Sequence, residues 1–385
     1  MKTKILSIMV ACLLAISVSA KAEVGVTDTE VVVGTWGPLT GPASVLGTIT
    51  MSFDAYFKFI NSLGGIHGRR IRLIMKDDAY NPKNTLAVVK ELVEKDKIFC
   101  LVGGLGTQNN LAVQDYLFKN KVPNIAPATG HSSMSNPPRR YRFCNMSRDI
   151  DQGRALMRWA AEKMGKKKIA LLYQNDSYGK EGMQGVEIEE KRLGVSLLCK
   201  VPVSVRDADL SAHALRLQKS GADTIIIYVT PRPAVRIVKE CHKIGFHPQF
   251  LSTTANNDPI MFKLAGDDWN GTIVVAWYIP FESYNPLAIY YRLALKKFAP
   301  KMPLGVFSAS GHIYGEILTI GLDATGRNLT REGLVKALES IKNVSGWSHN
   351  LSFGPNKRQG QSSVYFVQAK NGIHVPISDW ITIGE

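Results

Sequence analysis

The feature that most constrains the fold of this chain is a repeated alternation of apolar runs typical of strands with amphipathic stretches typical of helices. Residues 30–39 (EVVVGTWGPL) predict a strand followed by a turn, and Phe53, Tyr56, Phe57 and Ile60 then recur at helical spacing. Short strand and helix units in alternation favour a parallel sheet, because a parallel crossover needs a long connection, usually a helix. We therefore predict an α/β fold.

The alternation restarts after Asp149, which predicts a second unit of the same kind. A chain of 385 residues is in any case long for a single hydrophobic core. Asn371-Gly372, between two strand-like runs, is a strong hairpin signal and is expected to finish one of the sheets. The remaining predicted strands lie at 71–78, 97–104, 122–128, 168–174, 195–201 and 224–229.

The N-terminus has the pattern of a secretory signal peptide. Lys2 and Lys4 precede an apolar run at 5–18, and small residues then allow cleavage after Ala22. We therefore expect residues 1–22 to be removed and the mature protein to be exported to the periplasm.

The charge of the chain argues against a nucleic-acid partner. The formal charge falls from +15 to +12 without residues 1–22, because that segment carries three lysines and no acids. The mature chain is still basic, yet its basic residues are dispersed and are not interleaved with a nucleic-acid motif. We expect no nucleic-acid partner, although anionic solutes could be attracted over a long range.

The cysteines give no sign of a metal site. Cys100, Cys144, Cys199 and Cys241 follow the signal peptide and lack CxxC or Cys/His spacing. We expect no metal and no cofactor. Export permits disulfides, but the sequence does not assign their pairing, and buried free thiols are the alternative for Cys100 and Cys144.

Residues 101–110 (LVGGLGTQNN) lead from an apolar run through a glycine-rich turn into a predicted helix. The glycines would let main-chain N–H groups approach a ligand, and a helix N-terminus favours an anion. The stretch does not predict nucleotide binding, because the GxGxxG spacing and a lysine followed by Ser or Thr are both missing. The Thr107 hydroxyl and its neighbouring N–H groups suit a carboxylate, and a plain capped turn is the alternative.

The next turn, residues 126–135 (APATGHSSMS), offers a possible but weak catalytic arrangement. His131 with Ser132 and Ser133 could act as base and nucleophile. Residues this close in sequence rarely meet with triad geometry, and no acid partner is evident. We therefore expect no catalytic residues and no enzyme activity.

Aromatic residues near the predicted strand ends could contact an apolar ligand. Tyr178 follows the strand at 168–174, Trp36 lies in the first turn, and Trp277 and Tyr278 lie near a predicted crossing between the two units. Packing in the core or at a hinge is the alternative for each of them.

Taken together, four strings resemble the leucine/isoleucine/valine-binding family of periplasmic solute-binding proteins, whose type I fold serves ABC importers. They lie in this order at 37–47, 55–82, 101–117 and 169–182. The turn at 121–130 (KVPNIAPATG) is similar to that of a branch whose members take up aromatic or other organic acids.

This resemblance implies two lobes, each a mainly parallel sheet flanked by helices, that close on a ligand about three crossings. The closed form would be recognised by the membrane permease of an ABC importer, and we expect a monomer. The crossings are expected near 145–149, 278–280 and 350–354, so that lobe I would comprise 23–147 plus 280–350 and lobe II 148–279 plus 351–385.

The resemblance also implies a ligand site. The family's carboxylate-binding hydroxyl falls on Thr107 and its aromatic lid on Tyr178. The chain departs from the family at Leu46 and Thr230, which replace aromatic residues, and at Thr254, which replaces the acid that pairs with an α-ammonium. With the main-chain contacts of the 126–135 turn, the predicted set is Leu46, Thr107, Ala128, Thr129, Gly130, Tyr178, Thr230 and Thr254.

The replacement at Thr254 bears on the ligand. An amino acid would bury its ammonium group without a partner there, at a cost of several kcal/mol. We therefore expect a small organic acid without an α-amine, with an apolar or aromatic body against Leu46, Tyr178 and Trp36, to bind better than leucine or valine. A branched-chain amino acid is the alternative.

Three classes of function follow. The leading one is solute binding for import. The second is a sensory receptor of the same fold coupled to a signalling partner, and neighbouring genes would separate it from the first. The third is an exported hydrolase that uses His131 and its serines, which predicts that Ser132→Ala abolishes turnover.

Overall fold

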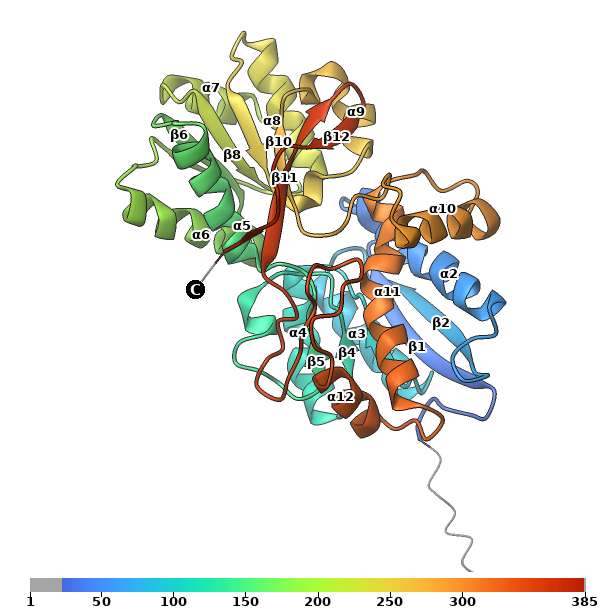
Figure 1. Cartoon of the computed structure of the whole chain (residues 1–385). Helices are drawn as coiled ribbons and strands as arrows, with labels where there is room; N and C mark the ends of the chain where they lie inside the picture. The colour runs from blue at the N-terminus through green and yellow to red at the C-terminus, as the bar shows by residue number, and fades with distance from the viewer. Residues whose placement is uncertain (1–22, 384–385) are drawn as a thin grey trace, which may run out of the picture.

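The computed structural model describes residues 23–383, so the predicted signal peptide lies outside the described residues. The chain forms two lobes, each built on an open sheet with helices on its faces (Figure 1). Among the described residues, no helix is both long enough and apolar enough to cross a membrane. The predicted α/β fold is confirmed.

The sheet of lobe I has the strand order β2-β1-β3-β4-β5, and every pair in it is parallel. This parallel order agrees with the alternation of strands and helices in the sequence. The strands are β1 (Glu30–Gly37), β2 (Arg70–Asp77), β3 (Cys100–Val102), β4 (Asn124–Ile125) and β5 (Arg142–Phe143).

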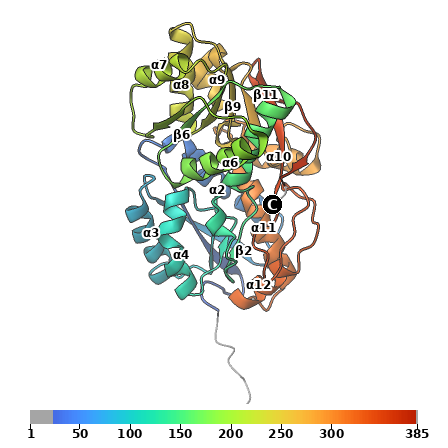
Figure 2. The same cartoon turned by 90° about the vertical axis from the view of Figure 1, so that its left-hand side faces the viewer.

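Helices cover both faces of this sheet (Figure 2). Asn81 caps α3 as the sequence predicts, because its side chain accepts the Lys83 N–H at 3.0 Å and Pro82 is the first helical residue. The predicted apolar residues Phe53 and Phe57 are buried on α2, which packs against α11. The helices are α2 (Gly47–Ser62), α3 (Pro82–Glu94), α4 (Thr107–Lys119), α10 (Pro286–Phe298), α11 (Val306–Thr325) and α12 (Arg331–Glu339).

The sheet of lobe II has the strand order β12-β11-β10-β9-β8-β6-β7, with β13 paired to β11. Its strands from β6 to β10 are parallel, whereas β11 is antiparallel to both of its neighbours in this order. The strands are β6 (Ile169–Gln174), β7 (Lys200–Val203), β8 (Thr224–Tyr228), β9 (Gln249–Ser252), β10 (Ile273–Ala276), β11 (Ser363–Lys370), β12 (Ile373–Pro376) and β13 (Ile381–Thr382).

Two sequence predictions in lobe II have different outcomes. The hairpin is confirmed, because Asn371 and Gly372 join β11 to β12 with φ values of 51° and 90°. The strand predicted at 195–201 was placed too early, since β7 begins at Lys200. The apolar run before it lies at the sheet edge, where Leu198 is exposed.

Helices also flank the sheet of lobe II. The chain enters this lobe at α5, which continues as a π-helical turn over Trp159–Lys163 and packs against α6. The helices are α5 (Asp149–Arg158), α6 (Ser177–Leu193), α7 (Ser211–Lys219), α8 (Pro231–Lys243) and α9 (Ile260–Ala265).

The chain passes between the lobes near 144–148, near 277–285 and before β11. Residues 351–360, predicted to begin the return to lobe II, instead pack on lobe I (Figure 1). The Phe353 ring meets Phe143 edge-on at 5.2 Å, and the Cys144 N–H donates to the Arg358 carbonyl at 2.9 Å. We therefore propose a lobe boundary near Gln361 in place of the predicted one at 350.

The four cysteines within the described part of the chain are free thiols. Cys100 and Cys144 are buried, which agrees with the alternative given for them above. Burial raises the pKa of the Cys100 thiol to about 12, so this group is not a reactive thiolate.

Candidate functional site

A cavity lies between the two lobes, at the carboxyl ends of strands from both sheets. Turns that follow parallel strands meet at this edge of a sheet, where α/β folds bind ligands. The cavity leaves about 90 Å³ open to the centres of water molecules, which is room for a small ligand. Its lining includes all eight predicted residues: Leu46, Thr107, Ala128, Thr129, Gly130, Tyr178, Thr230 and Thr254.

Two threonine hydroxyls form the polar wall on the lobe I side. Thr107 is the first residue of α4, and its Oγ1 lies 2.8 Å from Thr129 Oγ1. The Thr129 hydroxyl also accepts the His131 N–H at 3.3 Å. Since the two hydroxyls share one hydrogen bond, one of their two protons remains for a ligand oxygen. The first N–H groups of α4 add to this donor surface.

The predicted contact between Trp36 and a ligand is wrong. Trp36 is fully buried in the core of lobe I and does not line the cavity. A Cβ on Gly104 would lie 2.2 Å from the Trp36 ring, so this glycine lets the tryptophan pack beneath the turn. Gly104 therefore serves aromatic packing rather than the approach of main chain to a ligand.

Lobe II contributes a second polar wall. Tyr178, at the start of α6, lines the cavity, and its hydroxyl donates to Thr253 Oγ1 at 3.0 Å. Thr230 directly precedes α8, and its hydroxyl donates to Gln174 Oε1 at 2.8 Å rather than capping the helix. Both side chains are thereby held in fixed orientations. The predicted aromatic residues Trp277 and Tyr278 line the cavity as well.

The sequence predictions missed an acid, Asp149, in this cavity. It is the first residue of α5, its side chain is fully buried, and its Oδ2 has no hydrogen-bond partner among the described residues. The Tyr228 hydroxyl lies 3.2 Å from the other oxygen and 3.1 Å from the Asp149 carbonyl oxygen. Burial and the neighbouring Glu181 carboxylate raise the pKa of Asp149 well above its ordinary value.

The expectation that an amino acid would find no acid here stays a prediction, and Asp149 bears on it. Thr254 does line the cavity without supplying one, but Asp149 lies beside the hydroxyl wall. The Asp149 N–H donates to the Gly130 carbonyl at 2.8 Å. A Cβ on Gly130 would lie 2.9 Å from Asp149 Oδ1. The carboxyl therefore lies against the turn at 126–135 that also carries Thr129.

The remaining wall is apolar and comes largely from lobe I. Val306 and Phe307 open α11, Tyr314 follows two turns later, and Ile49 faces them from α2. No motif marks these positions, because they come from helices packed beside the sheet rather than from strand ends. Their hydrophobic periodicity predicts burial and does not predict which side faces a ligand.

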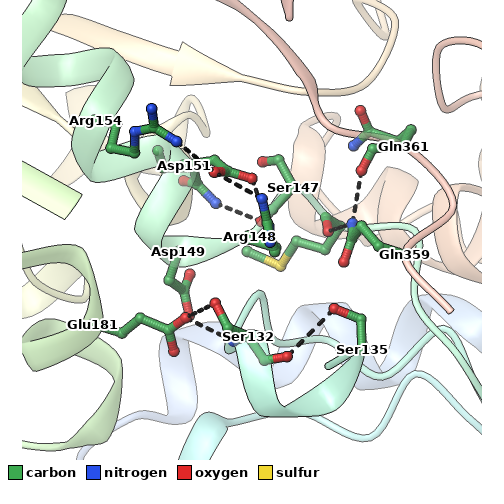
Figure 3. Close-up of polar contacts among 12 residues, drawn as sticks. Ser132, Ser135, Ser147, Arg148, Asp149, Asp151, Arg154, Glu181, Gln359 and Gln361 are labelled. Carbon is green, nitrogen blue, oxygen red and sulfur yellow. Dashed lines mark hydrogen bonds and ion pairs between the residues drawn. The ribbon is translucent and has the colours of Figure 1, made fainter. Parts of the chain in front are cut away.

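An acid from lobe II also reaches the turn at 126–135 in lobe I (Figure 3). Glu181 Oε1 accepts the Ser132 N–H at 2.7 Å and also accepts the Ser132 hydroxyl. Its other oxygen lies 3.0 Å from His131 Nε2, while His131 Nδ1 lies 2.9 Å from Ser133 Oγ. His131 therefore does have an acid partner, which the sequence did not reveal. None of these four residues lines the cavity.

This contact joins the two lobes. Ser132 and His131 belong to lobe I and Glu181 to α6 of lobe II, so the hydrogen bonds hold the lobes together beside the cavity. Within the part of the chain that the structure describes, no group of His, Cys, Asp or Glu is placed to hold a metal ion.

Comparison with known proteins agrees with this architecture. A family model described as periplasmic binding protein matches residues 30–373. Leu/Ile/Val-binding protein homolog 3 of Brucella melitensis is 23% identical over 332 residues, which cover 85% of this chain and 89% of that protein. Leu/Ile/Val-binding protein BraC3 of Rhizobium johnstonii is 20% identical, with 88% and 91% covered.

Solved structures share the fold. A fatty acid ABC transporter substrate-binding protein from Thermomonospora curvata has a TM-score of 0.85 at 22% identity, and the match covers 94% of each chain. A branched chain amino acid ABC transporter protein from Thermus thermophilus, with bound valine, has a TM-score of 0.84 at 20% identity, covering 93% of this chain and 97% of that one.

Proposed function

This chain belongs to the periplasmic binding protein family, and we propose that it is the solute-binding component of an ABC importer, which closes two lobes on a small carboxylate-bearing ligand. The membrane permease of that importer would be its partner. The cavity that both lobes line supports this proposal. An extracytoplasmic location follows from the family, and N-terminal sequencing of the exported protein would test cleavage after Ala22.

We further propose that the ligand is an α-amino acid with a small apolar side chain. The observation that carries this is the Asp149 carboxyl, unpaired at Oδ2, beside the hydroxyls of Thr107 and Thr129. A ligand carboxylate on these hydroxyls would bring its α-ammonium within reach of Asp149. The ammonium would supply the missing partner and would favour the ionised carboxyl that burial otherwise disfavours.

A second candidate is a small organic acid without an amine, as the sequence suggested. The raised pKa of Asp149 favours its protonated form, which could donate a hydrogen bond to a ligand oxygen. The similar structure from Thermomonospora curvata, described as a fatty acid ABC transporter substrate-binding protein, lends this candidate further support.

Calorimetry with matched ligand pairs would separate the two candidates. Leucine is compared with 4-methylpentanoate and valine with 3-methylbutanoate, so that each pair differs only by the amine. We expect the amino acids to bind at least about tenfold more tightly, a difference of about 1.4 kcal/mol. Asp149→Asn should abolish that preference, while the exposed Asp267→Asn should preserve it.

Tighter binding of the deaminated acids would instead establish the second candidate. If both pairs failed to bind while native mass spectrometry of the purified protein found a retained molecule, the small-apolar ligand class would be wrong. A protein that binds no carboxylate at all would contradict the solute-binding proposal itself.

A further inference from the structure

Tyr80 stands between the cavity described above and a second chamber, called the outer chamber below. It lines both of them. The outer chamber is larger, with about 320 Å³ open to the centres of water molecules. Its lining is polar and comes from both lobes, with Asn81 and Gln108 on one side and Gln174, Asp176 and Arg206 on the other.

The backbone at Tyr80 has an uncommon conformation. Ala79 and Tyr80 have φ values of 50° and 58°, in the left-handed region that residues other than glycine rarely adopt. Asp77 Oδ1 accepts the Ala79 N–H and Asp78 Oδ1 accepts the Tyr80 N–H, each at 2.9 Å. Such a conformation persists where its surroundings hold it, and it is found preferentially at ligand sites.

The ring of Tyr80 lies against the start of α4. Gly106, which precedes Thr107, has a φ of 104°, and a Cβ there would lie 2.9 Å from Tyr80 Cε2. A side chain at this position would therefore displace the ring. Because Gly106 has no side chain, the ring lies directly beside the part of the cavity wall that Thr107 and Thr129 form. This cavity is called the inner cavity below.

Lobe II meets Tyr80 from the opposite side. Gln174 of β6 lines the outer chamber together with Tyr80. Gln174 Oε1 accepts the hydroxyl of Thr230, which lines the inner cavity, while its Nε2 donates to Asp176 in the outer chamber at 2.6 Å. Tyr80, which lines both spaces, and Gln174, which lines the outer chamber, thus lie between the largely apolar cavity and the polar chamber.

We infer that the Tyr80 ring sets the maximum length of the ligand, and that the outer chamber is a subsite for the uncharged, hydrogen-bonding end of a longer ligand once that ring is absent. This inference rests on the proposed function for the short end of the ligand. Amide side chains contribute much of the chamber wall, and its one acid and one arginine oppose each other in charge. Amide and hydroxyl groups therefore suit it better than a net charge does.

The test compares Tyr80→Ala with Tyr80→Phe by calorimetry. The probes are leucine, Nε-acetyllysine and 2-aminononanoate, the last two having side chains of equal length that differ in polarity. Wild type and Tyr80→Phe should bind leucine and exclude both long probes. Tyr80→Ala should bind Nε-acetyllysine at least about tenfold more tightly than wild type does, and more tightly than 2-aminononanoate.

Several outcomes would overturn the inference. In the first, wild type binds leucine and Nε-acetyllysine with equal affinity, and in the second, Tyr80→Ala loses all binding. In the third, Tyr80→Ala keeps its affinity for leucine without binding either long probe more tightly than wild type does. In the fourth, Tyr80→Ala gains affinity for 2-aminononanoate alone. Tyr80→Gly, which accepts the left-handed backbone, replaces the alanine variant if circular dichroism shows that the latter is unfolded.

Failure of the proposed function would give a different pattern. If wild type binds no α-amino acid, the proposed ligand class has failed while Tyr80 can still be tested. The three probes are then used as their deaminated acids, with the same expected order. If wild type and both variants bind none of these either, the inference falls together with the proposed function.

Discussion

At the scale of single residues, Thr107 is the better of the two lobe I threonines at the cavity to replace in a test of carboxylate binding. Its Oγ1 is 2.8 Å from Thr129 Oγ1, and the pair keeps one proton for a ligand. Thr129 also accepts a main-chain N–H, so its replacement would disturb the turn as well. Thr107 can therefore be changed with the smaller effect on local structure.

We predict that Thr107→Val weakens binding of a carboxylate ligand by about 10- to 100-fold, because a hydrogen bond to a charged group contributes roughly 1.5–3 kcal/mol. Calorimetry measures this loss. Thr35→Val is the matched control, since the Thr35 hydroxyl is also buried but lies outside the cavity. Equal affinities in wild type and Thr107→Val would refute the role of this hydroxyl.

At the scale of elements, α11 contacts lobe II at its N-terminus and another segment of lobe I through the side chain of Glu316. Asp258 of lobe II accepts the Phe307 N–H at 2.8 Å, and Glu316 accepts the Trp347 N–H at 2.8 Å. Burial raises the pKa of Glu316 to about 7. A native carboxyl with a raised pKa keeps its proton longer than the unfolded chain does, so its ionisation destabilises the fold as pH rises.

We predict that Glu316→Gln removes part of this pH dependence. The free energy of unfolding of wild type, relative to that of the variant, should fall by up to about 3 kcal/mol as the pH rises from about 4.5 to about 7. Denaturant unfolding at several pH values measures it. The exposed Asp28→Asn is the control and should follow wild type, whereas a constant difference between wild type and Glu316→Gln would disprove the prediction.

A second element, α6, carries the acid that joins the lobes. Glu181 Oε1 accepts the Ser132 N–H at 2.7 Å, and Glu181 Oε2 lies 3.0 Å from His131 Nε2. Both contacts require the two lobes to be close together. They should therefore contribute to ligand affinity without touching the ligand, because binding and closure are thermodynamically coupled.

We predict that Glu181→Gln lowers ligand affinity about 5- to 20-fold, as expected when charge-assisted hydrogen bonds become neutral ones. Glu187→Gln is the control, because Glu187 lies on the same helix and pairs with Lys200 within lobe II at 2.7 Å. Small-angle scattering should also show more open molecules for Glu181→Gln at equal ligand concentration. An unchanged affinity would show that the contact does not stabilise closure.

At the scale of the whole molecule, the residues that sequence patterns could place are those that follow strands directly. Thr107 and Tyr178 begin helices right after β-strands, so the parallel topology alone brings them to one edge. Asp149 and Glu181 could not be placed in this way. Their positions depend on how α5 and α6 pack beneath the other lobe, which no local pattern encodes. Trp36 was misplaced because a strand-end aromatic can point into the core as readily as into the cleft.

The same dependence on packing between lobes leads to the last prediction, on closure. The described conformation is closed: besides the Glu181 contacts, Arg232 of α8 donates to Ser44 Oγ of lobe I at 3.4 Å. These contacts span the cleft beside the cavity, so we expect the lobes to separate when the ligand leaves. Protein freed of retained ligand by unfolding, dialysis and refolding should therefore have a larger radius of gyration than the complex. Ligand at 100 times its Kd should reduce that radius and stabilise the fold by about 2.7 kcal/mol. Thr107→Val at the same ligand concentration should remain more open. Binding heat without any change in the radius of gyration would mean that the lobes do not close on the ligand, and the importer proposal would then lose its mechanism.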